Sequence, residues 1–104
     1  MDRKRLDMQT EKNGTELTIR LSGQLNTATA KKLSDLLDEE LPGVQSLTFD
    51  FEGCSYVSSV GLRVLLNTYK QLKAAKGKML LTNVGESFME VLDATGLDGS
   101  FDIR

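Results

Sequence analysis

The sequence predicts an α/β fold with a mixed, largely parallel sheet of four to five strands, an N-terminal hairpin and three or more helices. Apolar and polar residues alternate near the N-terminus, as in half-buried strands. Asn13-Gly14, a strong hairpin signal, separates two such runs. Segments of helical periodicity then alternate with short apolar runs. Strands that alternate with helices pair in parallel through right-handed crossovers.

The hairpin is expected from about Leu6 to Ser22. The next residues, 23–27, break the second strand, and Asn26 or Thr27 can accept hydrogen bonds from the first free N–H groups of a helix. That helix carries apolar residues at helical spacing, namely Ala30, Leu33, Leu36, Leu37 and Leu41. Pro42-Gly43 is expected to end it.

The elements in the second half of the chain follow from the same patterns. In order, they are a strand from Val44 to Phe51, a short connection from Glu52 to Ser59, a long helix, a buried strand from Met79 to Leu81, a helix from about Glu86 to Ala94 and a last strand with Phe101 and Ile103. The long helix has one apolar stripe, made of Leu62, Leu65, Leu66, Tyr69 and Leu72. Gly77 is expected to end it in the left-handed conformation. In the third helix, Phe88, Val91 and Leu92 are expected to face inward.

Length and composition limit the classes of protein to consider. The 104 residues suit a single domain spanning 1–104, and a net charge of -2 gives no basic footprint for nucleic acid. The chain has no long apolar run of a signal peptide or membrane span, so we expect a soluble, cytoplasmic protein with no membrane partner. One cysteine excludes an intrachain disulfide.

Catalytic and cofactor motifs are absent from the sequence. There is no histidine, which excludes imidazole bases, and a single cysteine cannot build a zinc site. No glycine-rich phosphate loop precedes a helix. Cys54 is interpreted as a small, partly buried thiol, and the carboxylates of the first helix, Asp35, Asp38, Glu39 and Glu40, as a solvated face. We therefore expect no enzyme, no cofactor and no metal.

The most informative segment runs from Leu47 to Leu66, where a strand leads into a helix that opens with Ser58 and Ser59. Two serines there can simply be N-caps. A helix start also offers free N–H groups and a partial positive charge, which accommodate a phosphate. Phosphorylation would add about 1.5 to 2 negative charges. Gly61, which lacks a Cβ, leaves room for the close approach of a docked surface.

At these residues the sequence resembles the STAS family, in particular its anti-sigma factor antagonists. The family signature has an Asp at a strand, then Asp-Ser-Ser-Gly-Leu at the start of an amphipathic helix. The matching positions are Asp50 and the run from Tyr56 to Leu62. Gly23-Gln24-Leu25-Asn26, with Thr29-Ala30, is similar to the motif before the first helix, and Asn83-Val84 and Thr95-Gly96-Leu97 are similar to later motifs. The resemblance implies a STAS-like fold over nearly the whole chain.

The resemblance also implies a switch. Ser59 matches the serine that is phosphorylated in family members. The unphosphorylated antagonist binds an anti-sigma factor that is also a serine kinase, which frees a sigma factor, and a PP2C-type phosphatase resets the phosphorylated form. The implied partner surface consists of Gln24, Leu25, Asn26, Thr27, Ser58, Ser59, Val60, Gly61, Leu62 and Arg63.

The chain departs from the family pattern at three positions. Ser58 and Asn26 replace aspartates, and Val60 replaces the second serine. Ser58 is a second candidate acceptor, with Ser59 favoured by its position in the motif. The alternatives are a STAS domain that senses a ligand such as a nucleotide or serves as a subunit of a larger complex, a scaffold that binds one partner constitutively, and a small enzyme of unknown type. The chain is expected to be a monomer or a weak dimer.

Overall fold

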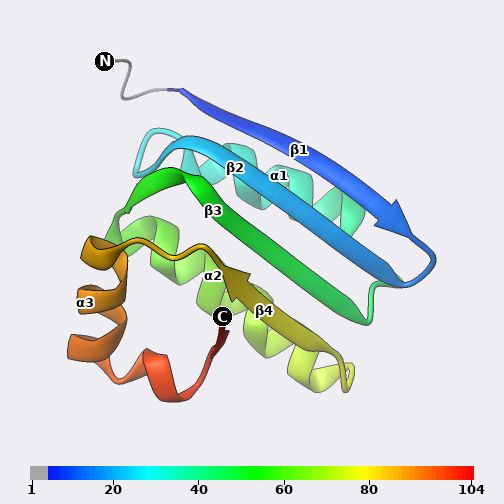
Figure 1. Ribbon diagram of the computed structural model, residues 1–104. Helices are drawn as coiled ribbons and strands as arrows, with labels where there is room; N and C mark the ends of the chain where they lie inside the picture. Colours follow the sequence, from blue (N-terminus) through cyan, green and yellow to red (C-terminus); the bar gives the residue numbers. More distant parts are fainter. Residues whose placement is uncertain (1–4) are drawn as a thin grey trace.

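The computed structural model describes residues 5–104. Its elements, in chain order, are β1 (Leu6–Asn13), β2 (Glu16–Leu25), α1 (Ala30–Glu40), β3 (Ser46–Val57), α2 (Ser59–Ala74), β4 (Lys78–Thr82), α3 (Glu86–Thr95), a 3-10 turn (Leu97–Gly99) and β5 (Asp102–Ile103). Figure 1 shows how the strands form one twisted sheet. The predicted order of strands and helices is confirmed.

The five strands lie in the sheet in sequence order, from β1 to β5. β1 and β2 pair antiparallel through the Asn13-Gly14 hairpin, and the other neighbouring pairs are parallel. Each helix-containing crossover connects a strand to its next neighbour in the sheet, and all of them proceed toward β5. Right-handed crossovers of this kind place their helices on the same face of the sheet. The predicted mixed, largely parallel sheet is therefore confirmed, and one of its faces has no helix (Figure 1).

The hydrophobic core lies between the helices and the inner face of the sheet. Its fully buried side chains are Leu17, Ile19, Leu21, Leu25, Leu33, Leu47, Phe49, Phe51, Leu65, Leu81, Phe88 and Leu92. Phe88 of α3 packs on Phe51 of β3, with ring centroids 5.2 Å apart. Tyr69 of α2 meets Phe101 edge to face at 5.3 Å. These contacts connect the helices to the sheet and to the C-terminal segment.

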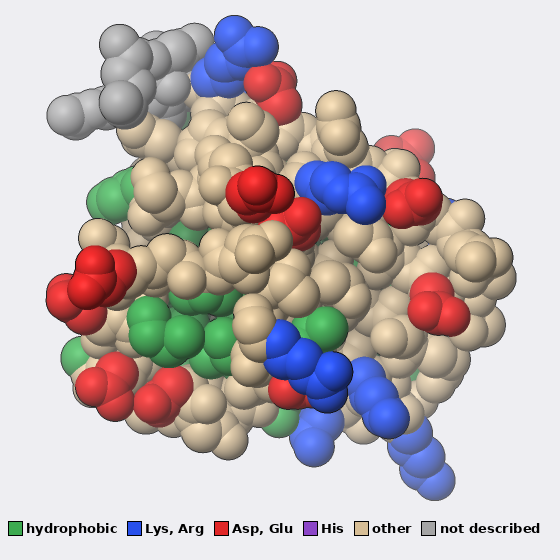
Figure 2. Space-filling model, in the orientation of Figure 1, with side chains coloured by type: hydrophobic (Ala, Val, Ile, Leu, Met, Phe, Trp, Pro, Cys, Tyr) green, Lys and Arg blue, Asp and Glu red, His purple; other side chains and the backbone are tan. Residues whose placement is uncertain are grey.

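The outer face of the sheet is polar. Arg20 of β2 pairs in register with Asp50 of β3, and Thr18 pairs with Thr48. Figure 2 shows this face, with acidic and basic side chains near its centre and hydrophobic atoms gathered toward α3. The alternation predicted for the N-terminal hairpin thus separates a buried face from a solvated one.

Two strands are longer than the sequence predicted. The segment after Phe51, expected to be a connection, continues β3 to Val57, and β2 continues past Gly23 to Leu25. Irregularities in the β2–β3 register near Gly23 break the alternation on which the prediction rested. Gly23 has φ +118°, and a Cβ there would collide with the Arg5 carbonyl oxygen. Only glycine suits this close approach of β1 and β2.

Two helix predictions were wrong in detail. The left-handed residue after α2 is Lys76, with φ 61°, and not Gly77. Position 77 requires glycine for a different reason: a Cβ there would lie 2.7 Å from the Gln45 carbonyl oxygen. Val91 was expected to face inward but is exposed, whereas Phe88 and Leu92 are buried as predicted. Gly96 ends α3 in the left-handed conformation.

Candidate functional site

The candidate site forms where β2 and β3 end. Because the two strands are parallel, their carboxyl ends meet at the same edge of the sheet, and Gln24 pairs with Tyr56 while Leu25 pairs with Val57. The Ser58 amide then donates a 2.8 Å hydrogen bond to the Leu25 carbonyl oxygen. The loop before α1 and the start of α2 are therefore held side by side, as the predicted partner surface requires.

The loop between β2 and α1 is fixed by its own polar side chains. The Asn26 Oδ1 accepts hydrogen bonds from the Ala28 and Thr29 amides at 3.0 and 3.2 Å. Thr29, which is fully buried, accepts from the Asn26 amide and donates to the Gln24 carbonyl oxygen at 2.6 Å. The N-cap of α1 is Thr29, so the prediction that Asn26 or Thr27 caps this helix was wrong. Asn26 instead stabilises the turn before the helix, because the amides that it binds precede Ala30.

The two serines at the start of α2 have different roles. Ser58 is the N-cap, with extended backbone angles, and its Oγ accepts a hydrogen bond from the Gly61 amide at 3.2 Å. Ser59 is the first residue of the helix and is exposed. None of the described residues forms a hydrogen bond with the Ser59 Oγ. The Ser58 hydroxyl is therefore engaged in the fold, while the Ser59 hydroxyl is available.

Gly61 makes room for a residue of its own chain. A Cβ at Gly61 would lie 2.6 Å from the Leu25 Cγ and 3.0 Å from the Leu25 carbonyl oxygen. The prediction that the missing Cβ serves a docked partner therefore needs correction, because Leu25 occupies that space. Leu25 is completely buried, and Leu62 is half-buried against the core. Gly61, Leu25 and Leu62 therefore pack beneath the exposed residues of the site and offer little side-chain area to a partner.

The remaining predicted residues form the exposed part of the site. Thr27, Ser59, Val60 and Arg63 are exposed, and Val60 is 41% accessible. Tyr56, which the sequence analysis left out of the partner surface, is 52% accessible and pairs with Gln24. Large exposed aromatic side chains are enriched at protein interfaces. We call the set Gln24, Asn26, Thr27, Tyr56, Ser59, Val60 and Arg63 the docking surface.

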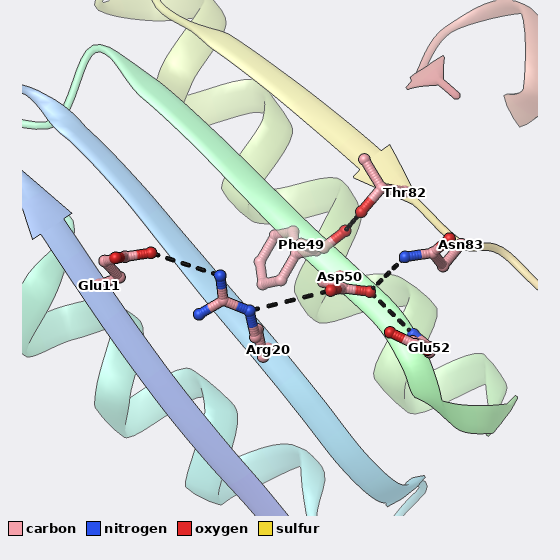
Figure 3. A network of polar contacts seen from close by, with 7 residues as sticks. All are labelled: Glu11, Arg20, Phe49, Asp50, Glu52, Thr82 and Asn83. Atoms are coloured by element: carbon pink, nitrogen blue, oxygen red, sulfur yellow. Dashed lines mark hydrogen bonds and ion pairs between the residues drawn. The ribbon is translucent and has the colours of Figure 1, made fainter.

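Asp50, the strand aspartate of the signature, belongs to a separate network on the outer face (Figure 3). It accepts hydrogen bonds from the Asn83 side chain at 2.9 Å and from the Glu52 amide at 3.0 Å. Arg20 lies 4.0 Å from its carboxylate and also contacts Glu11. The Asn83 bond, the Glu52 bond and the Arg20 charge lower the pKa of Asp50. Asp50 thus ties the turn after β4 to β3.

The remaining titratable candidates are structural. Cys54, expected to be partly buried, is 1% accessible, and burial raises the pKa of its thiol. In the first helix, Asp35 pairs with Lys31 and Glu40 with Lys12. Within residues 5–104 no group of acidic, Cys or His side chains is arranged to hold a metal ion. Over the same residues, no helix is long and apolar enough to cross a membrane.

Comparisons with known proteins show relatives in sequence and structures of the same fold. The anti-sigma-B factor antagonist of Bacillus subtilis is 26% identical over 98 residues, which cover 94% of this chain and 90% of that protein. An anti-sigma factor antagonist structure from Mycobacterium paratuberculosis superposes with a TM-score of 0.85 at 22% identity, covering 97% of this chain and 86% of that one. The structure of the phosphorylated form of the Bacillus cell fate determinant SpoIIAA superposes with a TM-score of 0.76 at 22% identity, and the match covers 94% of this chain and 91% of that one. A family model described as the STAS domain matches residues 7–104. Because this match spans nearly the whole described chain, the protein belongs to the STAS domain family.

Proposed function

We propose that this protein is a cytoplasmic anti-sigma factor antagonist whose docking surface binds an anti-sigma factor that is also a serine kinase. Its curated relatives are anti-sigma factor antagonists, and proteins of this kind are non-enzymatic regulators. Binding occurs while Ser59 is unmodified and frees a sigma factor. Phosphorylation of Ser59 by the kinase, from ATP, ends binding, and a PP2C-type phosphatase restores it.

The observation that carries the proposal is the difference between the two serines. Ser58 caps α2, so a phosphate on its Oγ would remove the hydrogen bond from the Gly61 amide. Ser59 is exposed at the first helical position, and a phosphate there breaks no hydrogen bond of the described chain. The amides of Ser59 and Val60 lack partners within the helix and can stabilise the anion. A kinase can therefore modify Ser59 without unfolding its substrate.

Charge explains how the phosphate would end binding. The modification adds about 1.5 to 2 negative charges at a surface that is uncharged at Ser59 and Val60. Arg63 lies one helical turn from Ser59, at the i+4 spacing at which side chains meet. The phosphate would attract Arg63 and withdraw it from acidic groups of a partner. Repulsion of the partner's acids and the loss of the Arg63 contact both weaken docking.

The replacement of the family aspartates changes the charge of the docking surface. With Ser58 and Asn26 in their place, the docking surface carries no carboxylate of its own. The change in charge at Ser59 is then the dominant electrostatic event on this surface. A shift of about 2.8 kcal/mol would change affinity about a hundredfold.

The proposal can be tested with purified variants as baits in a lysate of the source organism, with captured proteins identified by mass spectrometry. Wild type and Ser59→Ala are expected to capture an ATP-binding anti-sigma kinase, and Ser59→Asp is expected to lose it. The matched control is Ser87→Asp, since Ser87 is also exposed in the first turn of a helix, α3. This control should bind as wild type does.

A second measurement tests the acceptor directly. The captured kinase and ATP are incubated with wild type, Ser58→Ala and Ser59→Ala, and phosphate transfer is followed by intact mass. We expect transfer to wild type and Ser58→Ala only. If Ser59→Asp and Ser59→Ala capture the same protein equally well, control by charge is refuted and a constitutive scaffold is favoured. Nucleotide binding by the isolated chain without any transfer would instead favour a ligand-sensing domain.

A further inference from the structure

β1 is an edge strand, and none of residues 5–104 pairs with its free side. Within the described chain, β1 pairs only with β2, and its eight residues run without a proline or a register shift. Figure 1 shows it along the outer margin of the sheet. An uncovered edge of this length presents a row of unpaired N–H and C=O groups to any other strand. β5, at the opposite edge, has only two residues.

The pairing with β2 fixes which groups point outward. The Gln24 amide donates to the Arg5 carbonyl oxygen, so odd-numbered residues of the strand direct their main-chain groups toward β2. The N–H and C=O groups of Leu6, Met8 and Thr10 therefore point away from the sheet. Their side chains lie on the inner face, where Met8 is only half-buried. The free edge thus combines unpaired backbone groups with an apolar side chain that is incompletely covered.

The charges along β1 favour self-pairing in one register. In an antiparallel pair of copies with its twofold axis at Met8, Arg5, which contacts Asp7 of its own strand at 2.9 Å, lies opposite Glu11 of the second copy on the outer face. The half-covered Met8 side chains of the two copies then pack against each other on the inner face. Glu11 already contacts Arg20 of β2, so a second cation would extend an existing ion-pair network.

Neighbouring registers are less favourable. An axis at Gln9 would set Asp7 opposite Glu11, and an axis at Asp7 would bring two identical carboxylates together. Like charges directly opposite each other destabilise paired strands. An axis at Thr10 would set Met8 opposite Lys12, whose ammonium already contacts the Glu40 carboxylate. Among these four registers, the axis at Met8 is the one that sets opposite charges against each other and leaves no like charges facing among residues 5–11.

We propose that this protein self-associates through β1, with two copies forming a continuous ten-stranded sheet about a twofold axis at Met8. Leu6, Met8 and Thr10 of each copy exchange main-chain hydrogen bonds with Thr10, Met8 and Leu6 of the other. The contact is isologous, so it closes at two copies. A strand edge buries little area, which places the dimer among weak, concentration-dependent assemblies. The inference is independent of the proposed function, because β1 contributes no residue to the docking surface.

Disulfide trapping tests the register. In a hydrogen-bonded antiparallel pair the Cα atoms lie about 5.5 Å apart, within the range that a disulfide spans. Met8→Cys is expected to form a covalent dimer under mild oxidation. The control Thr10→Cys shares its edge and its face, but its two copies would lie about 13 Å apart, four residues along the strand. The wild-type chain, which carries the buried Cys54, shows whether that thiol by itself forms a covalent dimer.

Thr10→Pro tests the hydrogen bonds without disturbing the monomer. Its amide points outward, so proline removes no bond to β2, and edge strands tolerate proline. Sedimentation velocity up to about 1 mM should show a wild-type dimer whose dissociation constant rises about tenfold or more in Thr10→Pro. Circular dichroism should show that the fold is retained. A wild-type chain that stays monomeric, equal trapping of the two cysteine variants, or a dimer unaffected by Thr10→Pro would each overturn the proposal.

Discussion

The contact between Gly61 and Leu25 gives a quantitative prediction for the variant Gly61→Ala. The new methyl group would lie 2.6 Å from the Leu25 Cγ and 3.0 Å from the Leu25 carbonyl oxygen. Real Cβ contacts almost never fall below 3.0 Å, so either Leu25 or the start of α2 has to move. Because Leu25 is completely buried, its side chain cannot move without disturbing the core residues around it.

The expected magnitude combines two opposing effects. Overpacking a well-filled core costs about 1 to 3 kcal/mol. Replacing glycine by alanine within a helix contributes about 1 kcal/mol in the opposite direction. The free energy of unfolding should therefore fall by about 1 kcal/mol, the middle of a net range of about 0 to 2 kcal/mol. A helix-propensity argument alone gives the opposite sign, so the experiment distinguishes the two.

Urea unfolding at 25 °C, followed by circular dichroism, measures the effect. The control is Gly99→Ala, where a new Cβ meets nothing within 4 Å, and its change should stay within about 0.5 kcal/mol. In the double variant with Leu25→Ala, the cost of Gly61→Ala should shrink, giving a coupling energy of about 1 kcal/mol. A Gly61→Ala variant as stable as wild type, or strictly additive changes in the double variant, would refute the packing argument.

Three further predictions concern single residues. In urea unfolding, Ser58→Ala should lower the free energy of unfolding by about 1 kcal/mol, whereas Ser59→Ala should change it by less than about 0.5 kcal/mol. Equal effects of the two substitutions would contradict the assignment of Ser58 as the cap. Gly23→Ala should cost about 2 kcal/mol or more in the same assay because of its positive φ and the Arg5 carbonyl, and an unchanged midpoint would count against that strain. The folded-state pKa of Asp50 is below its ordinary 3.8, so its stabilisation is complete above that pH and lost as the pH falls. The stability difference between wild type and Asp50→Asn, about 1 kcal/mol at pH 7, should therefore shrink below pH 3.8, and a difference constant down to pH 2.5 would contradict this.

The order of elements could be predicted from the sequence because its signals are local. Asn13-Gly14 sets the hairpin, Pro42 follows the first helix and Gly96 ends the third. The true end of β3 could not be predicted. Residues 52–57 are strand because β2, far away in the sequence, supplies their hydrogen bonds, and the register shifts near Gly23 hide the period of two.

The candidate site was predictable in its location but not in its detail. The pair of serines indicated the helix start, yet the extended backbone of Ser58 decides which serine caps the helix. The motif assigned Leu25 to the surface. The Leu25 side chain is instead buried, in the space that the missing Cβ of Gly61 leaves open. Tyr56 had one usable signal, an aromatic side chain just before the serines, but its exposure depends on the strand continuing to Val57.

The hydrogen bond from the Ser58 amide to the Leu25 carbonyl has a kinetic consequence. Together with the close approach of Gly61 to Leu25, it ties the loop before α1 to the start of α2. A molecule that docks there meets a preformed surface, and no segment has to become ordered on encounter. Association should then be limited by diffusion and orientation, at about 10⁵ to 10⁷ M⁻¹s⁻¹. Differences in affinity among variants of this surface should accordingly appear in how long complexes last rather than in how fast they form.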